Sequence, residues 1–366
     1  MTEHSKSFLY QYLNNASPTG FEASGQQLWL DYLKPYIDEY IVDTYGTAVG
    51  VIHGADDSPH KNYKVVIEAH SDEISWFVNY ISDDGYLYVR RNGGSDALIA
   101  PSMRVNLHTK KEIDGTTIRQ GVFGWPAIHV RDLTKDTAPK VSDLFIDVGA
   151  ATKDEVLALG IHVGTVCTFV DGLTEMNGRF FVGRALDNRM GGFMIAEVAR
   201  QLKENNVRLP YTLYVVNSVQ EEIGLRGAEM ISRRLRPDLA ICTDVTHDTQ
   251  SPKYDKKEQG DLKCGSGPVL CYGPAVQNNL LDFMIDVADK QTIPFQRQAV
   301  SRSTGTDTDS FAYAAEGVAS ALISLPLKYM HTTVETVHQE DVQAVIRLMY
   351  EVLMNLKGNE DFRYIK

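Results

Sequence analysis

The sequence is poor in the features that mark membrane, secreted or nucleic-acid-binding proteins. No stretch approaches the roughly 18 consecutive apolar residues that a membrane span requires. The N-terminal segment has no basic stretch followed by an apolar run, so we expect no secretory signal. Positive charge is scarce, because 36 Lys and Arg stand against 48 Asp and Glu. The resulting net charge of -12 disfavours nucleic acid as a partner.

Cysteine is scarce as well. The four cysteines are Cys167, Cys242, Cys264 and Cys271, and they show none of the paired CxxC spacing of a zinc knuckle. At least two lie in strand-like runs, so we expect reduced thiols in the core and a cytoplasmic location. The remaining composition, 43% hydrophobic and 23% charged, is that of a globular protein with a large core. A length of 366 residues suits one large domain with a smaller one, or two of similar size.

Short apolar runs alternate with helix-like segments along most of the chain. The apolar runs cover residues 65–67, 213–216, 239–242 and 319–325. The helix-like segments cover residues 188–204, 224–235, 278–290 and 341–356. Short continuous apolar runs are typical of strands that are covered on both faces. The alternation therefore predicts an α/β fold, with a mixed sheet that is mostly parallel at its centre and flanked by helices.

Residues 74–180 follow a different pattern, in which short strands are separated by turn signals. These signals are Asp83-Asp84-Gly85, Asn92-Gly93-Gly94, Asp114-Gly115 and Met176-Asn177-Gly178. Turns at such spacing indicate a small β-rich domain, either barrel-like or PDZ-like. We predict that this domain is inserted into the α/β domain, which then consists of residues 1–73 and 181–366.

Residues that can bind a metal follow the strand-like runs. The four runs lead to His70, to Glu221-Glu222, to Asp244 and to His331, and Asp187 stands just before a helix-like segment. In open α/β sheets, ligands bind outside the carboxyl ends of the strands. We therefore expect these side chains to meet at one edge of the sheet.

Imidazole and carboxylate are the donors that zinc, cobalt or manganese accept at hydrolytic sites. A pair of ions about 3.5–4 Å apart needs a bridging carboxylate, for which Asp187 is the candidate. Burying both Glu221 and Glu222 is costly without cations, and one of them could bind metal while the other transfers protons. Considered alone, Asp187 could be a helix cap and His331 an ordinary loop histidine. The placement of all these residues after strands of one sheet favours a metal site.

At these residues the sequence resembles the tetrahedral aminopeptidases, a family of cytosolic peptidases with two zinc ions. Its members are often labelled glutamyl aminopeptidase or, misleadingly, cellulase. The matching segments are AHSDEI (69–74), RALDNR (184–189), VQEEIGLRGA (219–228), DVTH (244–247), GTD (305–307) and YMHTTVE (329–335). They occur in the family's order and cover nearly the whole chain, from Ser17-Pro18-Thr19-Gly20 onwards.

The resemblance implies a centre of two divalent ions in each subunit, most naturally zinc, with cobalt or manganese as alternatives. It implies that one ion is held by His70, Asp187 and Asp244. The other would be held by Asp187, Glu222 and His331.

The resemblance also assigns roles around the ions. Glu221 would be the general base, and Asp72 would orient His70. The inserted domain would match the family's oligomerisation domain, so we expect a homo-oligomer in which dimers assemble into a dodecamer. After GTD the family usually has small or apolar residues, whereas here Asp309 either adds charge near the substrate pocket or opens a helix. His247 either supports the site or caps a loop.

The expected function is a metal-dependent aminopeptidase that removes N-terminal residues from peptides. A two-metal carboxypeptidase and a deacylase of N-acyl amino acids are alternatives, because related folds use the same ligands for them. A non-catalytic scaffold would be expected to have lost a ligand or the base, and none is missing. Paired carboxylates also cleave glycosides, but that chemistry would leave both histidines without a role.

Overall fold

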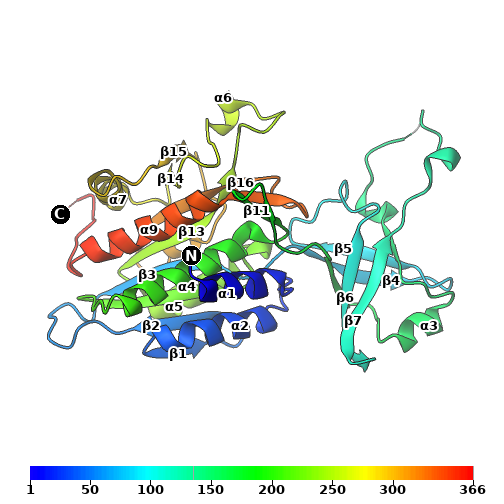
Figure 1. The fold of residues 1–366 in the computed structure, drawn as a ribbon, viewed down its shortest axis with the longest axis horizontal. Coiled ribbons are helices and arrows are strands. Elements are labelled where there is room, and N and C mark those ends of the chain that lie inside the picture. Colours follow the sequence, from blue (N-terminus) through cyan, green and yellow to red (C-terminus); the bar gives the residue numbers. More distant parts are fainter. Residues whose placement is uncertain (135, 366) are drawn as a thin grey trace.

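The computed structural model describes residues 1–134 and 136–365 and has two parts, an α/β body and a β-barrel beside it (Figure 1). The body contains an 11-stranded sheet. Its main path runs β1 (Glu39–Val42), β2 (Ala48–Ile52), β12 (Thr212–Ser218), β3 (Lys64–His70), β13 (Leu239–His247), β16 (Ala319–Lys328), β17 (Glu335–His338), β11 (Phe180–Gly183), β10 (Thr174–Met176). Off this path, β14 (Val269–Tyr272) pairs with β16 and with β15 (Gln296–Ala299).

The four central strands of the sheet, β12, β3, β13 and β16, are parallel. The strands on either side of them join antiparallel, starting with β2 on one side and β17 on the other. The structure thus confirms the predicted mixed sheet with a parallel centre. Because parallel strands end at the same edge, the ends of β3 and β12 lie together, with Ser218 opposite His70.

Helices cover both faces of the sheet. One face packs against α1 (Glu3–Asn14), α2 (Ala23–Leu33), α4 (Leu186–Glu204), α7 (Asn278–Lys290) and α9 (Gln339–Asn355). The other face packs against α5 (Arg226–Leu235) and α8 (Thr308–Ala312). The alternation of side chains along a strand explains the two cores, since Val65 and Ile67 enter the first and Val66 the second. The short α6 (Lys256–Gln259) lies in the excursion between β13 and β14.

The barrel is closed by six strands in the order β4 (Ser75–Ile81), β5 (Leu87–Asn92), β8 (Phe145–Asp147), β7 (Thr116–Phe123), β6 (Arg104–Ile113), β9 (Val166–Phe169). It also carries α3 (Lys153–Ala158) and has a separate apolar core around Trp76 and Phe123. These strands lie within the range predicted for the insert. The hairpin strand β10 falls in the same range of sequence, but it pairs with β11 in the large sheet.

Close packing of α4 against β3 sets the position of the residues at the start of α4. A side chain at Gly191 would approach the Ala69 Cβ to 2.8 Å, so only glycine lets the helix lie so close to the strand. Asp187 and Asn188 have non-helical backbone angles at this end of α4. Asp187 therefore faces the end of β3 and does not continue the helix. None of the helices within the described residues is long and apolar enough to span a membrane.

Candidate metal centre

The predicted metal ligands and the predicted base Glu221 come from five elements that meet at one edge of the sheet. His70 is the last residue of β3, and Asp244 lies near the end of β13. Glu221 and Glu222 begin the short 3-10 helix η4 (Glu221–Ile223) that follows β12. The remaining two are Asp187 at the start of α4 and His331 in the turn after β16. The structure thus brings together residues that are up to 261 positions apart in sequence (70 to 331).

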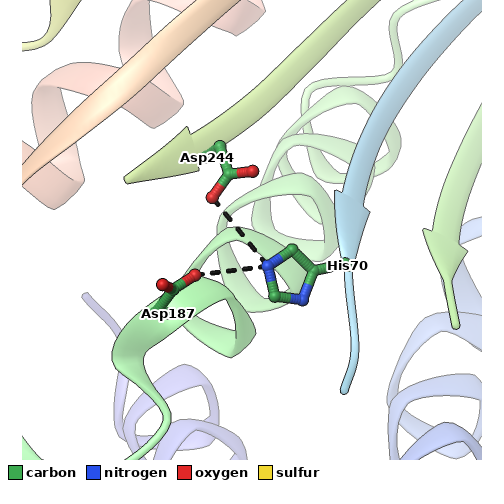
Figure 2. Close-up of side chains that lie close together, drawn as sticks. All are labelled: His70, Asp187 and Asp244. Carbon is green, nitrogen blue, oxygen red and sulfur yellow. Dashed lines mark hydrogen bonds and ion pairs between the residues drawn. The ribbon is translucent and has the colours of Figure 1, made fainter. Parts of the chain in front are cut away.

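Asp187 lies between the two histidines. Its Oδ1 is 3.2 Å from Nε2 of His70, and its Oδ2 is 3.4 Å from Nε2 of His331. Figure 2 shows the first of these contacts, together with Asp244, which approaches the same nitrogen of the His70 ring. Oδ1 of Asp244 is 3.9 Å from the same Nε2. One carboxylate that faces two imidazoles with different oxygens has the arrangement needed to bridge two ions.

Three groups of possible ligand atoms lie within 4.8 Å of one another among the described residues. One consists of His70, Asp187 and Asp244, and another of Asp187, Glu222 and His331. These are the two ligand sets that the family resemblance implies. The third group is His70, Glu221 and Glu222, so Glu221 is also within reach of an ion.

Asp72 contacts both His70 and the turn that carries the two glutamates. Its Oδ1 is 3.4 Å from Nδ1 of His70 and accepts a hydrogen bond of 2.9 Å from the backbone N–H of Glu221. Its Oδ2 accepts hydrogen bonds from the N–H of Glu222 and the hydroxyl of Thr19. The sequence suggested only the contact with His70. The additional backbone hydrogen bonds fix the position of Glu221 relative to the histidine.

Glu335 links two of the candidate ligands through their backbones. Its Oε1 accepts a hydrogen bond of 2.7 Å from the N–H of His331, and its Oε2 accepts one of 3.1 Å from the N–H of Asp187. The side chain is buried. Glu335 lies in the matching segment YMHTTVE, but its local sequence gave no sign of the second contact, which spans 148 positions.

Several carboxyl groups of the candidate metal centre are buried close together. Burial, followed by the charges of Asp244, Asp307 and Glu222, raises the pKa of Glu221 to about 10 despite the nearby His70. Burial also raises the pKa of Asp244 well above its usual range. The pKa of His331 rises to about 11 because Asp187 and Glu222 outweigh the opposing effect of burial. Without cations, this cluster would have to bind protons at neutral pH.

Two more buried acids, Glu68 and Asp307, lie beside the cluster and were not predicted to belong to it. The hydroxyl of Ser218 is 2.6 Å from a carboxyl oxygen of each. A hydroxyl can donate only one hydrogen, so one of the two carboxyls must be protonated to complete the chain of hydrogen bonds. Burial raises the pKa of Glu68 well above its usual range, and the charge of Asp307 adds to the effect.

The centre opens into a cavity of about 630 Å³. His247 and Asp309, whose roles the sequence left open, both line this cavity. The ring of His247 packs against Tyr254, with ring centroids 5.7 Å apart. The barrel side contributes Gly94, where a Cβ would lie 2.6 Å from the ring of His331. The lining residues in the described part of the chain include neither Lys nor Arg.

Glu22 is a buried carboxyl beside the turn that carries Glu221. It accepts a hydrogen bond of 2.7 Å from the N–H of Gly20 and another from the backbone of Gln220. Burial, together with the charge of Asp72, raises its pKa to about 8 from a usual value of 4.5. At pH values between the usual pKa of 4.5 and the raised pKa of about 8, this carboxyl holds a proton in the native protein but not in the unfolded chain. The contribution of Glu22 to stability therefore falls as pH rises through this window, by up to about 1.4 kcal/mol per pH unit.

Glu22→Gln is expected to remove this part of the pH dependence. Relative to the parent protein, the melting temperature of the metal-free variant should rise progressively from pH 5 to pH 8. Thermal melting at several pH values in that range checks this, with the exposed Glu258→Gln as the control for loss of one acid. If the difference in melting temperature between Glu22→Gln and the parent protein stays constant from pH 5 to pH 8, the pKa of Glu22 is not raised.

Comparison with known proteins gives consistent matches over almost the full length of the chain. The family model described as M42 glutamyl aminopeptidase matches residues 46–348. The lysyl aminopeptidase of Pyrococcus furiosus is 36% identical over 344 residues, which cover 93% of this chain and 94% of that protein.

Solved structures give the same picture. The TET aminopeptidase of a marine sediment Thaumarchaeota archaeon superposes with a TM-score of 0.89 at 28% identity, covering 96% of both chains. The TET1 peptidase of Pyrococcus horikoshii, which can assemble into a tetrahedron or a large octahedral shell, gives a TM-score of 0.83 at 25% identity. That match covers 96% of this chain and all of the other.

Proposed function

Because the chain belongs to the M42 glutamyl aminopeptidase family, we propose that its cavity is the active site of an aminopeptidase that uses two metal ions. The observation that carries the proposal is the placement of Asp187 between His70 and His331, with three further carboxylates around them. The substrates would be peptides with a free N-terminus.

Two divalent ions fit the residues that are present. His70, Asp187 and Asp244 would hold one, and Asp187, Glu222 and His331 the other. The donors are imidazole nitrogens and carboxylate oxygens, which suit zinc first and also cobalt or manganese. Bound ions would supply Lewis acidity to the scissile carbonyl and to the attacking water. The buried acids support the presence of such ions. Their pKa values are raised because buried negative charges are unfavourable when no cation balances them.

Glu221 would transfer the protons. As general base, its carboxylate would accept a proton from the attacking water and then deliver it to the leaving amine. The backbone hydrogen bond from Glu221 to Asp72 keeps this carboxylate near His70, with Oε2 3.8 Å from Nε2. Asp72 would also hold the ring of His70 from its far side, as carboxylate partners of zinc-bound histidines do.

A carboxypeptidase or a deacylase is less well supported. A carboxypeptidase needs a cation that recognises the terminal carboxylate, usually an arginine. Neither Lys nor Arg is found among the described residues that line the cavity. Two of the proteins compared above are named aminopeptidases and the third a peptidase, and none carries the name of a deacylase.

The proposal also covers the assembly of the protein and its location in the cell. We infer that the inserted module, predicted at residues 74–180, mediates assembly into a dodecamer built from dimers. The large shells formed by the Pyrococcus horikoshii peptidase support an assembly of this kind. The four free cysteines, all buried, suit a reducing cytoplasm.

The test compares two forms of one alanine tripeptide. The form with a free N-terminus and an amidated C-terminus should lose its first residue, and the form with an acetylated N-terminus and a free C-terminus should resist. Chelation should abolish hydrolysis, and zinc, cobalt or manganese should restore it. Faster cleavage of the acetylated form would assign the protein to the carboxypeptidases or the deacylases.

A further inference from the structure

The cavity lined by the acids and histidines also has apolar lining residues, and the part of the cavity that these form is called the recess. The recess lies against β14, β15 and β16 and the loop that precedes α8. Its apolar lining residues are Val245, Cys271, Val300, Leu322 and Met330. Such walls can pack against the carbon chain of a long side chain.

Asp309 is the charged residue of this recess. It is half-buried, in the first turn of α8, and lines the same cavity as the candidate metal ligands. Its Oδ1 accepts a hydrogen bond of 3.0 Å from the N–H of Thr304, and its Oδ2 accepts one of 3.2 Å from the N–H of Gly305. A carboxylate has about four lone-pair sites, so these two bonds orient the group and leave it able to accept more.

No positive group within the described residues neutralises Asp309. It forms no ion pair with a described Lys, Arg or His, and neither Lys nor Arg lines the cavity within this part of the chain. The charge of Asp309 acts on the nearby lining residue Cys271. Burial raises the pKa of the Cys271 thiol to about 11, and the charge of Asp309 adds to this effect. A half-buried carboxylate without a cation attracts a cationic ligand group more strongly than an exposed one does.

We propose that this recess receives the side chain of the substrate's N-terminal residue and that Asp309 selects a cationic one, lysine or arginine. The inference rests on the proposed aminopeptidase function. The apolar walls would contact the carbon chain of such a residue, and Asp309 would accept hydrogen bonds from its ammonium or guanidinium group. Asp309 is thus a specificity-determining residue, and its contacts with Thr304 and Gly305 hold it in place.

Lysyl and norleucyl amides test the proposal, because their side chains have the same carbon skeleton and differ in the charged group. The metal-loaded parent protein should hydrolyse the lysyl amide with a kcat/KM about 10- to 100-fold higher than the norleucyl amide, the range expected for one charge-assisted hydrogen bond. Asp309→Asn keeps an acceptor for the loop and removes the charge. It should lose this preference, because its kcat/KM falls far more for the lysyl amide than for the norleucyl amide.

Three further variants separate charge from structure. Asp309→Glu should retain a preference for the lysyl amide, and Asp309→Lys should favour a glutamyl amide over the lysyl one. Glu316→Gln removes an exposed acid from the turn after α8 and should change neither ratio.

The possible failures are distinguishable. Equal hydrolysis of lysyl and norleucyl amides by the parent protein would overturn the role of Asp309 and leave the aminopeptidase standing. An equal loss on both substrates in Asp309→Asn would show that Asp309 only supports the loop. If no aminoacyl amide with a free amine is hydrolysed with any of the metals, the proposed function itself fails, and the inference fails with it.

Discussion

Asp187→Ala is expected to cause the largest loss of metal and activity together. The two oxygens of Asp187 face different histidines, 3.2 and 3.4 Å away, so its removal takes one ligand from each proposed ion. The remaining acids, Glu222 and Asp244, would then have no carboxylate between them to hold two cations close together. We expect fewer than two ions per subunit and a kcat/KM at least about 1000-fold lower, since metal catalysis contributes several kcal/mol.

Metal analysis of the purified variant and hydrolysis of a free-amine peptide check this expectation. Asp289→Ala is the matched control, because it removes the same side chain from an exposed position on α7. It should keep two ions and full activity. A variant of Asp187 that still binds two ions and works within tenfold of the parent protein would show that another group bridges them.

The parts of the site that the sequence predicted are those marked by local pattern. Apolar runs of three or four residues lead to His70, to Asp244 and to the Glu221-Glu222 pair, and parallel strands bring such ends to one edge. The helices α4 and α7 likewise lie within two residues of the ranges predicted from their patterns. In these places the local pattern was sufficient, because the tertiary structure follows directly from where each strand or helix ends.

Other features depend on partners that are distant in sequence. Glu335 joins Asp187 across 148 positions, and nothing near either residue indicates that contact. The helix predicted from Gly224 begins at Arg226, because Gly224 and Leu225 both have positive φ and form a turn after η4. The turn signal at Asn177-Gly178 was correct as a hairpin, but which sheet the hairpin joins is decided by the pairing of β11 with β17.

The role of Asp309 in specificity also depends on contacts that its local sequence does not indicate. The sequence marked it as a departure from the family pattern and allowed two roles, an added charge or the start of a helix. The structure shows its carboxylate accepting hydrogen bonds from the loop amides of Thr304 and Gly305, and it places Asp309 in the lining of the cavity. These contacts with the loop hold the carboxylate in place, and residues 307–310 alone do not reveal them.

Glu221→Gln should separate metal binding from proton transfer. Glutamine has nearly the shape of glutamate, and the backbone hydrogen bond from residue 221 to Asp72 does not depend on the side chain. We expect two ions per subunit, a KM close to that of the parent protein, and a kcat about 100- to 10,000-fold lower, the range for loss of a general base. Single-turnover and steady-state hydrolysis of a free-amine peptide, with metal analysis of the same sample, measure all three.

The neighbouring residue provides the matched control for this experiment. Oε1 of Glu222 is 3.5 Å from Nε2 of His331, so Glu222→Gln should weaken the binding of an ion and should be partly rescued by excess metal. Glu221→Gln should not be rescued, because its ions are already bound. The group formed by His70, Glu221 and Glu222 allows the opposite assignment, in which Glu221 is a ligand. Loss of an ion from Glu221→Gln, with activity restored by added metal, would establish that assignment and require a different base.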